Sequence, residues 1–365
     1  MSSEPAGSDP GSLDDVAISL TDSEHDSIRE ELSKRARAQL ALPLDNEELL
    51  SEAKLAASLL PDRLLRALRR FRRHGNSAGA MLIRNMPTDS RLPATPQDGY
   101  LGHWSELPVA THAQLTVASV VGDVIAYADE KAGNLIQEIV PIKGAEARQE
   151  NSGTVYLELH TENGFHPHKP DFITLFCLRP DHARNSHTVV GAVAEVLPTL
   201  SAECVATLRR PQFRLRVSSS FGDNGTHLLT QSVAVLSGPA DSPEFLVDFH
   251  AMEPLTDDAG AALEELKRAL QTSLRGARLD TGDLLVIDNR AAVHGRTPFA
   301  AVHDETDRWL RRCFAVSDIR RSQGVRAPGS RVCKPLTIIG LSPYPADVSA
   351  AGPHTRAENL GCITS

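Results

Sequence analysis

The sequence predicts an α+β fold in which a jelly-roll core, a double-stranded β-helix, is flanked by helices. Before about residue 130 the apolar residues mostly recur at helical spacing, whereas after Gly133 they fall in many short segments separated by Gly, Pro and Asp or Asn turns. The chain contains no internal repeat, no GxGxxG loop and no GxxxxGK[ST] loop. Rossmann and P-loop folds are therefore set aside in favour of a pair of antiparallel sheets.

The bulk composition narrows the class of protein. The chain has 365 residues, 41% of them hydrophobic, which is enough for one large domain with a sizeable core. A formal net charge of −9 argues against a nucleic-acid partner, which would require a concentrated basic face. Five cysteines without CxxC spacing indicate reduced thiols. With no signal peptide and no apolar run of membrane-spanning length, we expect a cytoplasmic protein without a membrane partner.

The N-terminal part predicts a leader followed by helices. Residues 1–26 are rich in Ser, Asp, Glu and Gly, so we expect them to be disordered. Over residues 27–74 the helical spacing of apolar residues is interrupted near Pro43 and Pro61, which indicates two or three helices. The apolar run 79–87 then predicts a first core strand.

The remaining elements alternate between β-type segments and two helices. A helix is expected over residues 114–129 and another over residues 257–274, where apolar residues share one face. We expect strands over residues 135–140, 154–160, 172–178, 213–218, 245–249, 283–288 and 309–316.

These elements predict one domain over residues 27–325. Its helical N-terminal part covers residues 27–130 and its jelly-roll core covers residues 131–320. The Pro- and Gly-rich residues 326–365 predict a C-terminal extension over the surface.

The strongest local motif is His160-Thr161-Glu162, at the end of an alternating strand. Because side chains at positions i and i+2 of a strand share a face, His160 and Glu162 can both point at one metal ion. Alone the motif is weak, since such tripeptides occur by chance in many proteins.

A candidate third ligand lies downstream, in the segment 282–296. There an acidic turn enters an apolar strand, a polar turn follows, and His294 begins the next strand. Two histidines and one carboxylate leave three positions open on Fe(II), which is what a bidentate 2-oxo acid and O₂ require. Arg308, on the following strand, can pair with the distal carboxylate of such a co-substrate.

These motifs resemble a known family. The segment 160–168, with Pro170-Asp171-Phe172 and Cys177-Leu178-Arg179 after it, is similar to the clavaminate synthase-like Fe(II)/2-oxoglutarate-dependent oxygenases. Within that branch the likeness is closest to the bacterial hydroxylases of free arginine, lysine or asparagine. It covers roughly residues 60–325 and includes the segments 137–141, 282–296 and 308–314.

The resemblance implies an enzyme that uses Fe(II), 2-oxoglutarate and O₂ to hydroxylate an unactivated C–H bond of an amino acid or amino-acid derivative. The expected carbon is Cβ, and the expected setting is natural-product metabolism such as antibiotic biosynthesis. By the same resemblance His160, Glu162 and His294 would be the iron ligands. Arg308 would bind the C5 carboxylate of 2-oxoglutarate, and the Thr188 hydroxyl would support the same co-substrate.

The resemblance also implies residues that bind the substrate. Gln137 and Arg312 match positions that hold its backbone amine and carboxylate, and Asp248 matches an acidic position that contacts it. A planar Arg fork is suited to an α-carboxylate.

One departure from the family pattern bears on the substrate side chain. Relatives that accept a basic side chain carry two acids two residues apart, where this chain has Asp248 and His250, and the stretch 218–221 also lacks an acid. Because a buried cation needs close charge pairing, we expect a side chain less basic than arginine, with His250 as its hydrogen-bonding partner. The alternative is that His250 only packs at the rim and that Glu138 or Glu158 completes a cationic pocket.

Several alternatives stay open at this level. A hydrolytic zinc site also uses His and carboxylate ligands, although no HExxH motif is present. A catalytically silent jelly-roll binding protein would keep the fold without the metal. His166 and His168 are expected at the pocket rim, Asn289 in a turn and Arg296 in a structural role. The sequence also leaves open which amino acid is used, whether it is free or tethered to a carrier protein, whether the outcome is hydroxylation, desaturation or ring closure, and the oligomeric state.

Overall fold

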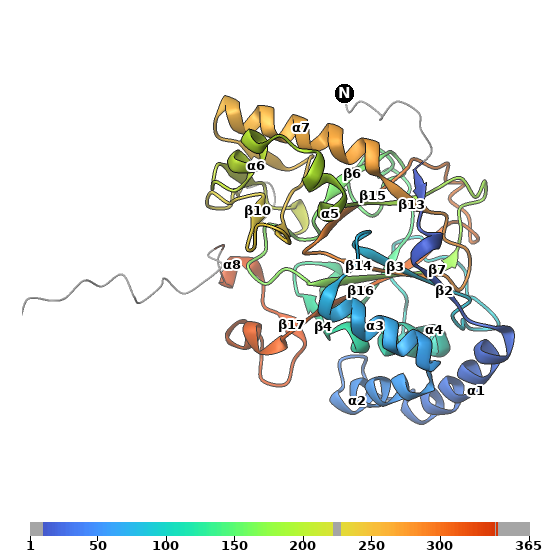
Figure 1. Ribbon diagram of the computed structural model, residues 1–365. Helices are drawn as coiled ribbons and strands as arrows, with labels where there is room; N and C mark the ends of the chain where they lie inside the picture. The colour runs from blue at the N-terminus through green and yellow to red at the C-terminus, as the bar shows by residue number, and fades with distance from the viewer. Residues whose placement is uncertain (1–9, 222–227, 340, 342–365) are drawn as a thin grey trace, which may run out of the picture.

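Two β-sheets form the core of the computed structural model, which describes residues 10–221, 228–339 and 341 (Figure 1). The smaller sheet has the strand order β1 (Gly11–Ser12), β13 (Arg275–Ala277), β8 (Thr188–Ala192), β15 (Ala292–Arg296) and β6 (Leu157–His160). The larger sheet has the order β17 (Val332–Cys333), β4 (Asp123–Tyr127), β16 (Trp309–Val316), β7 (Phe172–Arg179), β14 (Leu284–Asp288), β3 (Ala80–Arg84) and β2 (Ala17–Ser19). Side chains of both sheets share one apolar core, which confirms the predicted jelly-roll.

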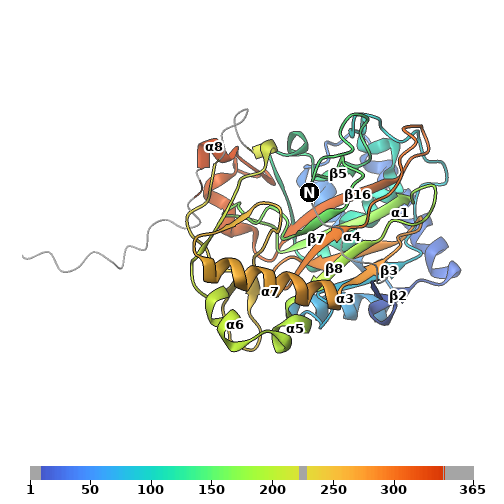
Figure 2. The ribbon, with the colours of Figure 1, turned by 90° about the horizontal axis from the view of Figure 1, so that it is seen from above.

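Helices flank both sheets, as predicted. The larger sheet is covered by α1 (Asp22–Gln39), α2 (Glu47–Leu55), α3 (Asp62–His74) and α4 (Pro108–Val121) (Figure 1). Helix α4 contacts the sheet directly and is itself covered by the other three, so nearly all of its residues are buried. On the smaller sheet, Figure 2 shows α7 (Asp257–Ser273) with α5 (Val193–Val196) and α6 (Ala202–Leu208) beside it. The helix predicted over residues 257–274 is thus confirmed.

Short elements complete the described part of the chain. Strand β5 (Ile136–Ile139) pairs with β16, β9 (Phe213–Leu215) pairs with β12 (Met252–Pro254), and β10 (Leu236–Ser237) pairs with β11 (Glu244–Phe245). A last helix, α8, covers Leu336–Ile339. The 3-10 helices are Asp14–Val16, Ala56–Leu59, Trp104–Glu106, Lys131–Gly133, Leu197–Thr199, Ser219–Phe221 and Ile319–Val325.

Two predicted strands are much shorter than expected. Of the residues 213–218 only the first half forms β9, and of the residues 245–249 only Phe245 belongs to β11. The chain after Phe245 instead crosses to the end of β6, where Val247 accepts the backbone N–H of Thr161. Strand β8, which the prediction did not include, fills the middle of the smaller sheet.

The helix predicted over residues 114–129 is wrong in its second half. Helix α4 ends at Val121, and the residues Asp123–Tyr127 form β4. The break is at Gly122, where an added Cβ would lie 2.6 Å from the carbonyl oxygen of Val316. Only glycine permits this close approach, which lets the β-branched residues after it pair with β16.

The predicted leader and domain division also need correction. Residues 10–26 are not disordered: β1 pairs with β13, β2 pairs with β3, and Leu13 and Leu20 are buried. Residues 1–9 lie outside the described residues. Three strands of the larger sheet precede residue 131, and β17 pairs with β4. The sheet core is therefore not confined to residues 131–320, because the segments before and after it supply edge strands.

The location of the protein is addressed by one finding. Among the described residues no helix is both long enough and apolar enough to cross a membrane. The cytoplasmic location stays a prediction.

Candidate metal centre and active site

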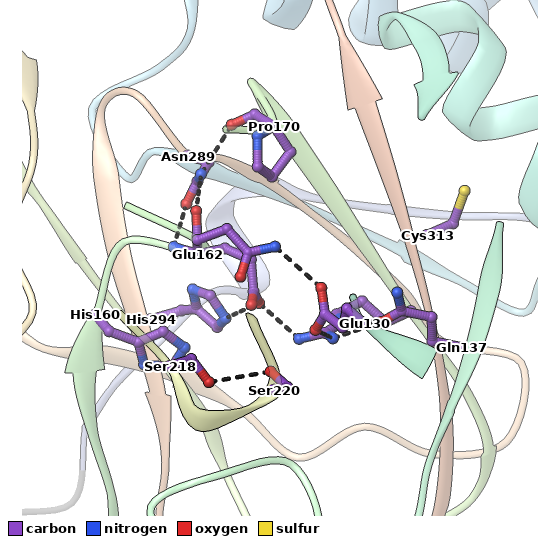
Figure 3. Close-up of polar contacts among 12 residues, drawn as sticks. Glu130, Gln137, His160, Glu162, Pro170, Ser218, Ser220, Asn289, His294 and Cys313 are labelled. Carbon is purple, nitrogen blue, oxygen red and sulfur yellow. Dashed lines mark hydrogen bonds and ion pairs between the residues drawn. The ribbon is translucent and has the colours of Figure 1, made fainter. Parts of the chain in front are cut away.

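The two paired strands β6 and β15 bring the candidate ligands together. Their antiparallel register places His294 opposite His160, with the ring centroids 4.4 Å apart. Glu162 follows two residues after His160, and its carboxylate points toward the two rings (Figure 3). One ligand atom from each of the three residues lies within 4.8 Å of the others. The structure thus assembles the three side chains that the sequence singled out.

The charge states of this cluster suit a divalent metal. Burial alone would raise the pKa of Glu162, but Arg312, His294 and His160 together hold it below its usual range. Burial, with His160 beside it, lowers the pKa of His294 to about 4. At neutral pH the site therefore presents a carboxylate and a neutral imidazole, and the buried Nδ1 of His294 has no hydrogen-bond partner among the residues that the structure describes. This donor set fits Fe(II) and leaves three coordination positions open.

A buried polar cluster adjoins the ligands. Nη1 of Arg312, on β16, lies 2.9 Å from Oε2 of Glu162, and its Nε donates to Oε1 of Gln137 at 3.1 Å. Arg312 also forms an ion pair with Glu130, whose carboxylate accepts a hydrogen bond from Asn163 at 3.0 Å. The structure therefore places Arg312 against the candidate ligand Glu162 and Gln137 against Arg312. Their predicted role in binding the substrate stays a prediction. Glu130 was not predicted, because it follows β4 and its position depends on the long-range pairing of β4 with β16.

A cavity of about 360 Å³ opens onto this cluster. His160, Glu162 and Glu130 line its inner part, and Asp248 and His250 also line it. Asp248 pairs with His160 as an isolated bridge, and its Oδ1 accepts the backbone N–H groups of His250 and Ala251, each at 2.9 Å. His250 is exposed, which places it at the rim.

The acids that might complete a cationic pocket already have partners. Glu138 accepts hydrogen bonds from Trp309 and from Nε of Arg311, at 3.1 Å for the latter. Glu158 lies 3.4 Å from Nζ of Lys267. Because both carboxylates are neutralised by buried or half-buried partners, neither is free to pair with a substrate cation.

Two buried arginines lie close together, Arg296 on β15 of the smaller sheet and Arg308 directly before β16 of the larger sheet. Arg296 donates from Nη2 to the carbonyl oxygens of Gly153 and Val155, at 2.8 and 3.1 Å. Arg308 is equally buried, yet it has no hydrogen bond or ion pair within the described part of the chain. Both guanidinium groups lie over the ring of Phe299, at 5.0 Å for Arg296 and 5.2 Å for Arg308. Burial lowers the pKa of Arg308 and, with Arg308 as a neighbour, lowers that of Arg296 to about 9.

The register of the smaller sheet places Arg296 on the same side as the candidate ligand His294. In β15 His294 and Arg296 are two residues apart, so their side chains share a face. Thr188 lies opposite Arg296 on β8 and therefore points to the same side. Arg308 reaches this region through Phe299, over whose ring both guanidinium groups lie. A buried cation that forms no ion pair among the described residues is suited to a carboxylate.

The sequence of this chain is similar to those of known proteins. The family model described as taurine catabolism dioxygenase TauD, TfdA family matches residues 69–314. The L-asparagine oxygenase of Streptomyces coelicolor is 37% identical over 95% of this chain and 100% of its own length. The L-lysine 3-hydroxylase of Catenulispora acidiphila is 33% identical over 78% of this chain and 80% of its own.

Solved structures are also similar. Asparagine oxygenase in complex with Fe(II), 2S,3S-3-hydroxyasparagine and succinate superposes with a TM-score of 0.82 at 36% identity, covering 87% of this chain and 99% of that one. The non-heme iron oxygenase OrfP in complex with Fe and alpha-ketoglutaric acid gives a TM-score of 0.77 at 30% identity, with the same coverage.

Proposed function

Because the chain belongs to the TauD/TfdA family of dioxygenases, we propose that its cavity binds a free amino acid with a neutral polar side chain and that hydroxylation takes place at Cβ. The chain is an Fe(II)- and 2-oxoglutarate-dependent amino-acid hydroxylase. This class replaces the hydrolase and the silent binding protein that the sequence left open. The proposal rests mainly on the ligand atoms of His160, Glu162 and His294, which lie within 4.8 Å of one another beside the cavity.

We assign the roles of the site residues from their contacts. His160, Glu162 and His294 hold Fe(II). Arg308, the buried cation beside Arg296, holds 2-oxoglutarate with the help of Thr188, which lies opposite Arg296. When bound, the iron and 2-oxoglutarate use O₂ to convert a substrate C–H into C–OH, releasing succinate and CO₂. The protein chooses the carbon by holding the substrate, because only the nearest C–H bond reacts.

The polar cluster around Arg312 is suited to the backbone of an amino acid. Arg312 and Glu130 form an ion pair with each other, and a bound amino acid would exchange with it: its α-carboxylate pairs with Arg312 and its α-ammonium group with Glu130. Gln137 orients Arg312 and has a buried Nε2 with no partner among the described residues. Because Arg312 also touches Glu162, a backbone held there brings the carbons next to Cα closest to the metal ligands. This proximity supports oxidation at Cβ.

We predict that the free amino acid, rather than its carrier-protein thioester, is the substrate. A thioester has lost the carboxylate, so the buried Arg312 would keep only Glu162, a candidate metal ligand, as its anion once Glu130 pairs with the ammonium group. Purified enzyme with Fe(II) and 2-oxoglutarate should form succinate with the free amino acid and none above background with the same residue loaded on a phosphopantetheine carrier. Faster turnover of the loaded carrier would contradict this assignment.

We also predict that the side chain is neutral. Asp248 already accepts hydrogen bonds from backbone N–H groups. The hydroxyl groups of Ser218 and Ser220 contact each other at 3.1 Å. His250 occupies the position where a second acid would be needed to bind a cation. Coupled succinate formation should be robust with asparagine and other neutral polar amino acids, and at least about tenfold lower in kcat/KM with arginine or lysine, since an unpaired buried cation costs several kcal/mol.

A pair of variants sharpens this test. His250→Asp restores an acid at the rim and should raise the arginine and lysine activities, whereas the neutral His250→Asn should not. Robust turnover of free arginine or lysine by the unmodified enzyme, with none for neutral polar amino acids, would show a cation-selective pocket instead.

A further inference from the structure

A fully buried amide, Asn289, contacts the backbone of a candidate metal ligand, and the mechanism above does not use it. Asn289 lies in the turn between β14 and β15. Its Oδ1 accepts the backbone N–H of Glu162 at 2.8 Å, and its Nδ2 donates to the carbonyl oxygens of Glu162 at 3.0 Å and Pro170 at 2.8 Å (Figure 3). All the hydrogen-bonding groups of this side chain are therefore used on main-chain atoms.

These contacts take the place of the hydrogen bonds that a neighbouring strand would make with the backbone of Glu162. Strand β6 ends at His160, and Glu162 begins a turn. Both main-chain polar groups of Glu162 are nevertheless satisfied, because the Asn289 amide pairs with them as a neighbouring strand would. The backbone of Asn289 adds a further bond, from its N–H to the carbonyl oxygen of Asp171 at 2.9 Å.

The position of Asn289 in the chain lets its hydrogen bonds link two of the candidate metal ligands. Asn289 precedes His294 by five residues, at the entrance to the strand that carries it. The side chain of Asn289 thus ties the backbone of Glu162 to Pro170, and its backbone N–H adds a bond to Asp171, directly before β7. Because the two ligands come from different strands, their separation depends on this connection.

We propose that Asn289 is a positioning residue that fixes Glu162 relative to His294, so that the metal site is formed before the metal binds. The inference rests on the proposed metal role of these two residues. An amide of this length is required: aspartate has no donor for the two carbonyl oxygens, alanine has neither donor nor acceptor, and glutamine is one methylene too long. Loss of a residue that positions a metal ligand typically lowers the metal affinity by about 10- to 100-fold.

The test measures metal binding alone, without substrate. Apo-protein is titrated anaerobically with Fe(II), and with Co(II), whose visible absorption reports coordination. Asn289→Asp, which keeps the shape, and Asn289→Ala should each weaken binding by about 10- to 100-fold and reduce the Co(II) absorption. The matched control is Asp288→Asn, at a buried residue of the same turn that caps the N–H of Arg290. It should bind metal as the unmodified protein does.

Each outcome decides a different claim. Metal affinity within about twofold of the unmodified protein in both Asn289 variants would overturn the proposal. So would variants that stay unfolded by circular dichroism even at saturating Co(II), because Asn289 would then be required for the fold itself. If the unmodified protein binds no metal, the assignment of the three ligands fails instead, and the two failures are told apart.

Discussion

His294→Ala is expected to abolish substrate-dependent succinate formation, since it removes one of two imidazoles from a site to which the described residues contribute three ligands. The remaining pair, His160 and Glu162, comes from one strand end and cannot enclose a metal face by itself. The exposed His74, at the end of α3, provides the control. His74→Ala should retain full activity.

Metal-dependent stability gives this prediction a second readout. A metal that binds only the folded state stabilises it by about 2.7 kcal/mol at a concentration one hundred times its dissociation constant. The melting temperature of the unmodified protein should therefore rise when Fe(II) is added anaerobically, and that of His294→Ala should not. A variant that keeps both the activity and the metal-induced shift would exclude His294 as a ligand.

The local parts of this site could be predicted from sequence, because they depend on strand geometry alone. The shared face of His160 and Glu162 follows from the two-residue repeat of a strand. His294 and Arg308 could be placed by motif order, although the structure puts His294 in the middle of β15 rather than at its start.

The parts that depend on distant pairing could not be predicted. Glu130 follows β4, and it meets Arg312 because β4 pairs with β16, far along the chain. Asn289 was identified as a turn residue, but its partners Glu162 and Pro170 lie more than one hundred positions away. Neither contact leaves a pattern in the neighbouring sequence.

The errors in the fold have a similar origin. Residues 10–26 have the composition of a disordered leader, and they are ordered only because β1 and β2 find sheet edges supplied by β13 and β3. The boundary between α4 and β4 did have a local signal in Gly122. Helical spacing continued past that glycine, so the close approach to Val316 that it permits was visible only in the structure.

Arg308→Met is expected to raise the KM for 2-oxoglutarate by on the order of 10²- to 10³-fold, because truncating one partner of a buried charge pair costs about 2–5 kcal/mol. Methionine keeps most of the side-chain volume and removes only the charge and its donors. Arg308→Lys should recover part of the affinity, since it restores the charge without the bidentate fork. The measurement is succinate formation at saturating amino acid over a range of 2-oxoglutarate concentrations.

The matched variant, Arg296→Met, should have the opposite profile. Arg296 donates hydrogen bonds to the carbonyl oxygens of Gly153 and Val155, so its loss leaves buried acceptors unpaired and should lower the melting temperature. The KM for 2-oxoglutarate should change much less than in Arg308→Met. Arg308 has no such partner in the described chain and is a desolvated cation when 2-oxoglutarate is absent. Arg308→Met should therefore melt no lower than the unmodified protein without 2-oxoglutarate, and it should lose the stabilisation that 2-oxoglutarate gives. A larger rise in KM for Arg296→Met than for Arg308→Met would transfer the co-substrate role to Arg296.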